Sequence, residues 1–153
     1  MAAGWRLVRQ RYAENAFSGE GARRFGGRWN SPGTPIVYTS AHLSLAGLET
    51  LVHVQPLTPR DAFIVFRLEW EDRLMEILPE SAWPPSWQAE PPGTSSMRIG
   101  DRWFREGRSA VLAVPSALIK EEKNYLLNPH HPDFRKVEIT RIREFFFDPR
   151  LRT

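Results

Sequence analysis

Residues 40–54 form a segment that is apolar on most sides when it is read as a helix. Such a helix has no polar face to turn to water, so we expect it to be buried in the core of the domain. Ser40 is a suitable N-terminal cap, and Pro56 stops the helix just beyond its end.

The chain has 153 residues, which fits one domain, residues 1–153, with a single core.

Short β-prone runs separated by turns lie on both sides of this helix. We expect strands at residues 36–39, 62–70, 109–114, 136–140 and 142–147, an extended piece at 73–78 and a second helix at 97–106. The remaining segments are expected to be a loop or short strand at 22–29, a turn at 30–35, a long Pro-rich loop at 79–96 and a polar segment at 124–132. Helices and strands do not alternate strictly, so the predicted class is α+β.

The composition excludes several classes of protein. The chain has no cysteine, which excludes disulfides and thiolate metal sites, and no H-E-x-x-H motif, so no metal site is expected. No apolar run is long enough for a membrane span or a signal peptide, and we expect a cytoplasmic location. The net charge is +3 with a pI of about 9.7, and the arginines cluster near the two ends. Such a surface could meet nucleic acid, an acidic protein or a phosphorylated small molecule.

Glu49 is the most informative single residue. It lies in the middle of the apolar helix, where a carboxylate is costly to bury without partners. His53 follows one turn later on the same side, so it either satisfies Glu49 or lines the same cavity. Two structural interpretations stay open beside a functional one: a buried ion pair, or a helix orientation in which Glu49 reaches solvent.

Arg28 and Tyr38 are weaker candidates. Arg28 stands between Gly27 and Trp29 just before a turn, where a backbone can approach a ligand and a guanidinium can bind phosphate. The alternative for Arg28 is a surface arginine beside a turn. Tyr38 ends the strand before the helix and could stack on a flat ligand, although a core tyrosine is the commoner explanation.

The other polar residues show no catalytic spacing. Ser109, Ser116 and Asn128 lie beside apolar runs, but no Ser-His-Asp arrangement and no G-x-S-x-G motif can be argued for them. His130 and His131 are adjacent, so in an extended chain their side chains diverge. No phosphate-binding or dinucleotide-binding glycine motif occurs either.

Taken together, several segments resemble the RES-domain family, which is named for its Arg, Glu and Ser residues. The matching segments are GGRWNSPGTPIVYTS at 26–40, LAGLETLVH at 45–53, SAVLAVPS at 109–116, NYLLNPHHP at 124–132, WRLV at 5–8 and FFFDPRL at 145–151. They occur in the expected order over nearly the whole chain, and the set is far more specific than any one of them. The resemblance is weakest in the Pro-rich loop at 79–96, which aligns with no functional segment.

The resemblance implies a fold similar to that of ADP-ribosyltransferases, with a split, mostly antiparallel β-core and helices around an NAD⁺ cleft. It implies a bacterial toxin that consumes NAD⁺ as its substrate, without a cofactor, by hydrolysis, phosphorolysis or ADP-ribosyl transfer. It also implies neutralisation by an Xre-type DNA-binding antitoxin, in a complex that is compatible with a toxin dimer. Direct binding to nucleic acid or membrane is not expected.

The family's residues carry over to Arg28, Tyr38, Glu49 and Ser109, and Arg6, His53 and Asn128 are added as pocket residues. Cleavage of the nicotinamide–ribose bond passes through an oxocarbenium-like sugar, which a fixed carboxylate at Glu49 would stabilise. Arg28 and Arg6 would bind the diphosphate. Tyr38 would stack on nicotinamide, and Ser109 would bond to nicotinamide or its ribose.

Two other classes of function are compatible with the sequence. An RNA-binding or RNA-cleaving toxin would explain the high pI and the arginine clusters, but the net charge is modest and the tryptophans do not alternate with basic residues. A catalytically inactive interaction module is the third class. The presence of all four family residues argues against it.

Overall fold

The computed structural model describes residues 1–54 and 56–151. The strands are β1 (Ala2–Arg9), β2 (Val37–Ser40), β3 (Phe63–Trp70), β4 (Met75–Ile77), β5 (Val111–Pro115), β6 (Lys123–Leu127) and β7 (Glu138–Phe145). The α-helices are α1 (Glu20–Phe25), α2 (Leu43–His53) and α3 (Thr94–Glu106), and the 3₁₀ turns are η1 (Gln10–Asn15), η2 (Asp72–Leu74), η3 (Glu80–Ala82) and η4 (Pro132–Lys136).

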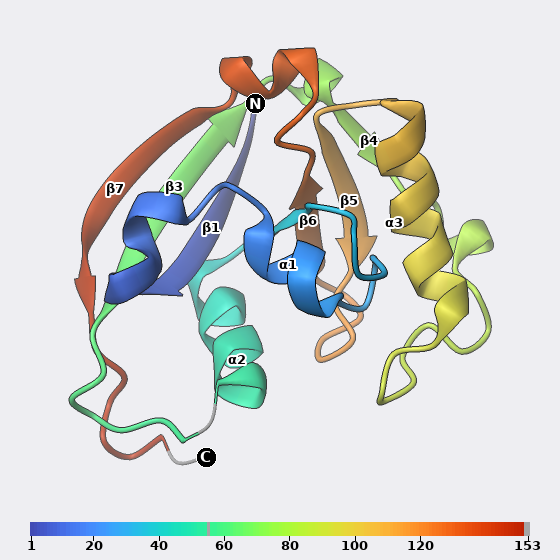
Figure 1. Ribbon diagram of the computed structural model, residues 1–153. Helices are drawn as coiled ribbons and strands as arrows, with labels where there is room; N and C mark the ends of the chain where they lie inside the picture. The colour runs from blue at the N-terminus through green and yellow to red at the C-terminus, as the bar shows by residue number, and fades with distance from the viewer. Residues whose placement is uncertain (55, 152–153) are drawn as a thin grey trace.

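Within the described residues, all seven strands belong to one sheet in the order β4-β5-β6-β2-β1-β3-β7, and only the β4–β5 pair is parallel (Figure 1). The sheet is split in the middle, because Trp5–Ser40 is the one residue pair in the described ladder between β1 and β2. By contrast, β1 and β3 pair along their full length of eight residues. The predicted α+β class with a split, mostly antiparallel core is confirmed.

Two helices cover the same face of the sheet, one on each half. Residues directly opposed on paired strands lie on the same face of a sheet, and so do alternate residues along one strand. Because Trp5 is paired with Ser40, these two residues lie on the same face of the sheet. On the β1–β3–β7 half this face packs against α2, through Leu7 and Ala46 among others. On the other half it packs against α3, with Trp103 on Leu112 and Leu126. The opposite face is covered by η1 and η4.

Residues 28–31, which follow α1, pack closely against α3. Gly100 of α3 faces the backbone of Trp29 so closely that a Cβ on Gly100 would lie 1.7 Å from the Trp29 carbonyl oxygen. The Ser96 hydroxyl donates to the Arg28 carbonyl at 2.7 Å. Asp101 accepts hydrogen bonds from both the backbone N–H and the hydroxyl of Ser31. These contacts fix residues 28–31 against α3.

Some local expectations are wrong, and each error has a physical cause. Ser40 does not cap α2: it ends β2, and its hydroxyl bonds to Asn124, while the helix begins at Leu43. The helix is not buried on most sides, because Leu48 and Val52 are 42% and 51% exposed.

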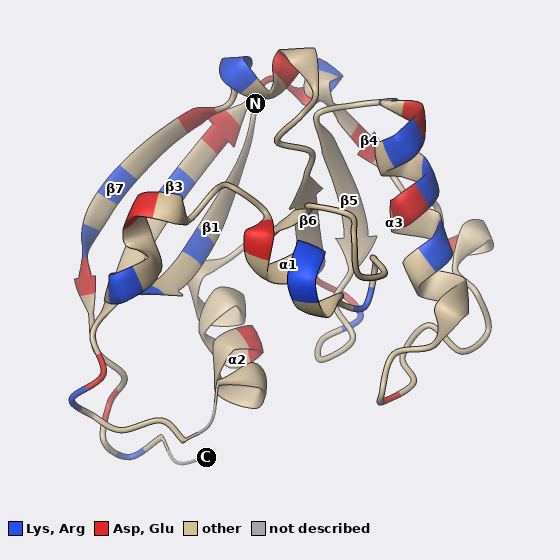
Figure 2. Ribbon diagram, viewed as in Figure 1, with Lys and Arg blue, Asp and Glu red and all other residues tan. Residues whose placement is uncertain are grey.

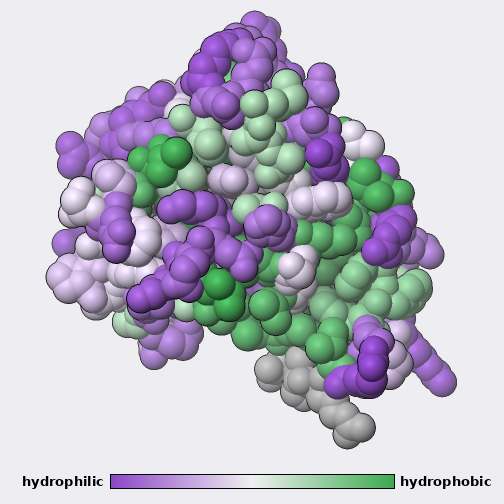
Figure 3. All heavy atoms as spheres, turned by 180° about the vertical axis from the view of Figure 1, so that it is seen from behind, coloured by the Kyte–Doolittle hydropathy of each residue, from purple (hydrophilic) through white to green (hydrophobic). Residues whose placement is uncertain are grey.

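Apolar side chains gather on the face of the molecule turned away from the view of Figure 1 (Figure 3).

Three segments have more regular structure than their composition predicts. β1 lies at residues 2–9, where no element is expected from the sequence, and β6 lies mostly in the polar segment at 124–132. α1 covers residues 22–25 of the segment at 22–29 that is expected to be a loop or short strand. The two closing strands are one, β7, with a bulge opposite Val65 and Phe66. No helix in the two described ranges is long and apolar enough to cross a membrane.

Replacing Gly100 with alanine should destabilise the fold strongly, because the added methyl group cannot fit against the Trp29 backbone. We expect the free energy of unfolding to fall by about 1–3 kcal/mol or more, as overpacking costs elsewhere. Urea denaturation measures this. Gly21→Ala is the matched control: it lies in α1 with open space around its Cβ position, and should be neutral or slightly stabilising. Equal stability of the two variants would contradict the packing described.

Candidate active site

Glu49 of α2 is held at the sheet by two neutral donors. Its Oε1 accepts hydrogen bonds from the Ser116 hydroxyl at 2.9 Å and from the Asn124 side-chain amide at 2.8 Å. The side chain is 24% exposed, and its Oε2 lies 3.9 Å from Nε2 of the exposed His53. One carboxylate oxygen is therefore fixed by two hydrogen bonds, while the side chain stays partly exposed. This differs from a fully buried ion pair and from a carboxylate that only faces solvent.

The two donors come from the β5–β6 hairpin. Ser116 follows β5 directly, and Asn124 lies in β6 opposite Val114. The Asn124 Oδ1 accepts from the Ser40 hydroxyl at 2.8 Å, which turns the amide group toward Glu49. The Ser116 Oγ accepts the backbone N–H groups of Leu118 and Ile119 at 3.1 and 3.2 Å. We call Ser40, Glu49, His53, Ser116 and Asn124 the Glu49 cluster.

Tyr38 shares the face of the sheet on which this cluster lies. It is two residues from Ser40 in β2, and Tyr38 and Ser40 pair with Leu126 and Asn124. Its hydroxyl donates to the Asn30 Oδ1 at 2.6 Å and accepts the Trp29 N–H at 3.1 Å. Burial raises the pKa of Tyr38 above its usual value, and the Asp101 carboxylate adds to the rise. The phenol is thus neutral and bonded to two partners, and its partly buried ring packs against the core cluster that contains Trp29 and Trp103.

Arg28 is held by the Pro-rich loop. Its Nη1 donates to the carbonyls of Trp87 and Ala89 at 2.8 and 2.7 Å, and its Nη2 lies 3.0 Å from the Glu90 carboxylate. The same loop reaches the neighbourhood of the cluster, because Gln88 Nε2 bonds to the carbonyl of Ala117, next to Ser116, at 3.5 Å. The loop therefore links Arg28 to the end of the hairpin that carries the donors.

Arg6 lies at the split of the sheet and does not join the Glu49 cluster. Its position in β1 alternates with Trp5 and Leu7, so it projects to the face opposite α2. The guanidinium donates to the carbonyls of Ala16 and Tyr38, both at 2.7 Å. Burial lowers its pKa to about 10, so it stays charged at neutral pH. Arg6 thus replaces a sheet hydrogen bond that the split removes.

Ser109 and Asn128 lie at the other end of the hairpin. Ser109 and Ser116 are seven residue steps apart in extended chain, which is roughly 20 Å. The Ser109 hydroxyl accepts from Trp103 Nε1 and donates to the Val111 carbonyl, both at 2.8 Å. The backbone N–H of Asn128 bonds to the Ala110 carbonyl at 2.9 Å, and its side chain accepts from the His130 N–H at 2.9 Å. The structure does not bring either residue to Glu49.

The sequence reasoning missed Ser40 and Asn124 and left Ser116 without a role. Ser109 and Ser116 flank the two ends of the same apolar strand. Which of them lies near Glu49 depends on which end of that strand meets α2. The signal that could have found Asn124 is its place at the start of a β-prone run, N-Y-L-L, where alternation puts Asn124 and Leu126 on one face.

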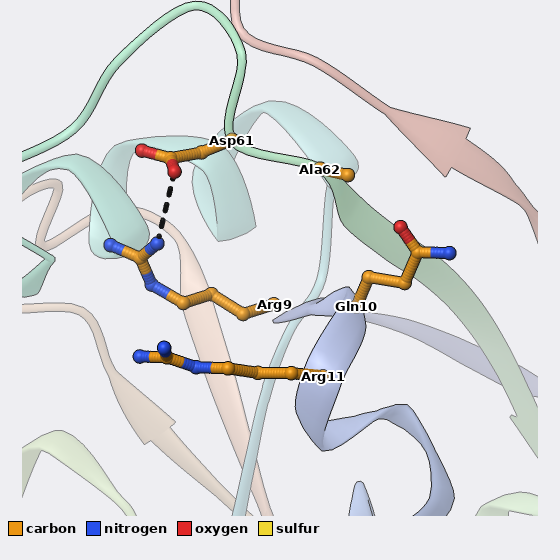
Figure 4. Close-up of a pocket in the computed structure, with 5 residues that line it drawn as sticks. All are labelled: Arg9, Gln10, Arg11, Asp61 and Ala62. Carbon is orange, nitrogen blue, oxygen red and sulfur yellow. Dashed lines mark ion pairs between the residues drawn. The ribbon is translucent and has the colours of Figure 1, made fainter.

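An open hollow of about 440 Å³ lies elsewhere, where β1 ends. Its lining residues are Arg9, Gln10, Arg11, Asp61 and Ala62 (Figure 4). Arg9 is paired with Asp61 at 3.3 Å, and none of the Glu49 cluster lines this hollow. Within the described residues, no group of three or more His, Asp and Glu side chains is placed to hold a metal ion.

The RES domain family model matches residues 3–148. The chain belongs to the RES domain family. A relative named Toxin Res, from Yersinia enterocolitica serotype O:8, is 39% identical over 149 residues, which cover 97% of this chain and 98% of the relative. The Prs ADP-ribosylating toxin of a Sphingobium strain is 37% identical over 153 residues, covering 96% and 94% of the two chains.

The fold also matches a solved structure. A chain in the crystal structure of the M. tuberculosis MbcT–MbcA toxin–antitoxin complex superposes with a TM-score of 0.72 and 18% identity, covering 97% of this chain and 85% of that chain. At this identity the match supports the fold alone. It agrees with the ADP-ribosyltransferase-like arrangement that the RES resemblance predicts.

Tyr38→Phe should destabilise this RES domain, because it leaves the Trp29 N–H without its acceptor and the Asn30 side-chain Oδ1 without this donor. We expect a loss of about 1–3 kcal/mol in the free energy of unfolding, measured by urea denaturation. Tyr12→Phe serves as the control, because Tyr12 is 56% exposed and should tolerate the change. If the two variants unfold at the same urea concentration, the buried network around Tyr38 is not as described.

Proposed function

We propose that this RES domain is the toxin of a toxin–antitoxin pair and that it cleaves NAD⁺ at the nicotinamide–ribose bond. The observation that carries the proposal is the Glu49 carboxylate, fixed by Ser116 and Asn124 and partly open to solvent. The names of the relatives, Toxin Res and Prs ADP-ribosylating toxin, support the same class of activity. Loss of cellular NAD⁺ would then arrest growth.

Glu49 has the properties that this reaction needs. Breaking the bond between the ribose C1′ and the ring nitrogen sends the electron pair to nicotinamide, which leaves as a neutral molecule, and positive charge develops on the ribose. A carboxylate held in place stabilises that charge without reorganising. Bonds from Ser116 and Asn124 to one oxygen keep the other oxygen available for a ribose hydroxyl. No second carboxylic acid is required.

The remaining residues bind the rest of the substrate. The Tyr38 ring would pack on the nicotinamide, and Arg28 would bind the diphosphate through charged hydrogen bonds. His53 lies at the rim beside Glu49, and Arg6 acts indirectly, by fixing the Tyr38 backbone. Ser116 acts as a positioning residue for Glu49, whereas the resemblance names Ser109 as the serine that binds nicotinamide or its ribose. Water, phosphate or a protein side chain would add to C1′ and complete the reaction, with loss of a proton from the acceptor.

The partner in this proposal is an antitoxin, of the Xre type that the family resemblance implies, acting in the cytoplasm. The relative named Toxin Res, together with the toxin–antitoxin complex that contains the structural neighbour, favours an antitoxin partner. An RNA-directed toxin is less well supported, because basic residues are interspersed with acidic ones on α3 and β7 (Figure 2). Several arginines are also already in surface ion pairs, among them Arg23, Arg67 and Arg102.

Glu49→Gln should abolish nicotinamide release, because it removes the charge at nearly constant shape while an oxygen remains to accept from Ser116 and Asn124. We expect at least about a hundredfold loss in the rate of NAD⁺ cleavage and an unchanged melting temperature. Mass spectrometry of the products, with and without phosphate, identifies the acceptor. Activity of the native chain should persist in EDTA. Full turnover by the Glu49→Gln variant would refute the proposed role.

The two serines provide a matched pair. Ser116→Ala removes one hydrogen bond to the carboxylate and should lower the cleavage rate about tenfold or more, as the loss of a bond to a charged group does. Ser109→Ala removes a hydroxyl that contacts Trp103 and Val111, so it should lower stability and keep the rate per folded molecule. If Ser109→Ala lowers the cleavage rate and Ser116→Ala does not, the functional serine is Ser109 and the role proposed for Ser116 is wrong.

A further inference from the structure

The Arg28 guanidinium has two kinds of partner in the Pro-rich loop. Its Nη1 donates to the fixed backbone carbonyls of Trp87 and Ala89. Its Nη2 pairs with a side chain, the Glu90 carboxylate, at 3.0 Å. The carbonyls set the direction of the guanidinium, whereas the carboxylate neutralises its charge.

The two ions of this pair differ in burial. The Arg28 side chain is 15% exposed, and the Glu90 side chain is 72% exposed. The carboxylate can therefore rotate into solvent and be fully hydrated there, while the guanidinium stays where it is. A pair with one exposed partner is weak, because water and salt screen it.

The frame around Arg28 stays in place when Glu90 turns away. Trp87 is 7% exposed and packs between Trp29 and Trp83, with ring centroids 6.3 and 5.2 Å away. The Ser96 hydroxyl holds the Arg28 backbone. Neither contact involves the Glu90 side chain, so only its rotation is needed to release Nη2.

We propose that Glu90 is an exchangeable counter-ion that occupies the anion position of Arg28 and is displaced by the diphosphate of the substrate. This inference rests on the proposed function, since NAD⁺ supplies the diphosphate. Carboxylate and phosphate oxygens accept the same paired N–H donors of a guanidinium, so the two anions exclude each other at Nη2. Glu90 thereby weakens substrate binding and gives the Pro-rich loop a part in setting affinity.

Glu90→Gln tests this directly. The variant should bind inorganic pyrophosphate, measured by titration calorimetry at low salt, about two- to fivefold more tightly than the native chain, which is the range expected for losing a competing exposed ion pair. The Michaelis constant for NAD⁺ should fall by a similar factor with kcat unchanged. Glu80→Gln removes the same charge from the same loop and should change neither value.

A double variant identifies the residue through which Glu90 acts. When Arg28 is replaced by alanine, the further change Glu90→Gln should have no effect on pyrophosphate binding. Melting temperatures close to that of the native chain are expected for Glu90→Gln and for a second variant, Glu90→Ala. Equal or weaker pyrophosphate binding by both variants, or an equal gain in Glu80→Gln, would overturn the proposal.

The outcomes separate this inference from the proposed function. Tighter pyrophosphate binding by Glu90→Gln without any nicotinamide release by the native chain would support the counter-ion and refute NAD⁺ cleavage. Nicotinamide release with pyrophosphate binding that does not respond to Glu90 would do the opposite. An absence of measurable pyrophosphate binding in native and variant chains would also overturn the counter-ion.

Discussion

The split between β1 and β2 is the constraint on which the rest of the architecture depends. The described ladder between these strands contains the single pair Trp5–Ser40, so the Tyr38 carbonyl would lack a sheet partner there. Arg6 supplies it, and the same guanidinium binds the Ala16 carbonyl at the end of η1. Burying this charge is costly, as the lowered pKa of Arg6 indicates, but it lets the two halves of the sheet diverge without an unsatisfied carbonyl.

Because the sheet diverges, α2 and α3 cover separate halves of one face, and the Glu49 cluster forms beside α2. The helix provides the carboxylate, and the hairpin of the other half provides both donors. The cluster therefore joins the two halves by side chains near the point where the backbone ladder is nearly absent. A change in how the halves are oriented would alter the geometry at Glu49 directly, which ties the stability of the split to the chemistry proposed for it.

The sequence identified the residues that stand out locally. Glu49 is conspicuous as a carboxylate in an apolar helix, and the alternation in residues 62–70 predicts β3 correctly. The errors arose where long-range pairing decides. Ser40 is a good helix cap by type, yet pairing with Asn124 keeps it in β2. Ser109 and Ser116 are equivalent by local pattern, and only the pairing of β5, β6 and β2 shows which end of the hairpin lies at α2. The same holds for Arg28, whose partners come from a loop about sixty residues away in sequence.

The central claim is that Glu49, presented by Ser116 and Asn124, contacts the ribose next to nicotinamide. A crystal structure of the Glu49→Gln variant with intact NAD⁺ tests it most directly, because the substitution keeps the shape of the site while preventing turnover. We expect the ribose hydroxyls to lie within hydrogen-bonding distance of residue 49, with the nicotinamide against the Tyr38 ring and the diphosphate at Arg28. NAD⁺ bound in the hollow beside Arg9 and Asp61, or with its nicotinamide ribose remote from α2, would contradict it.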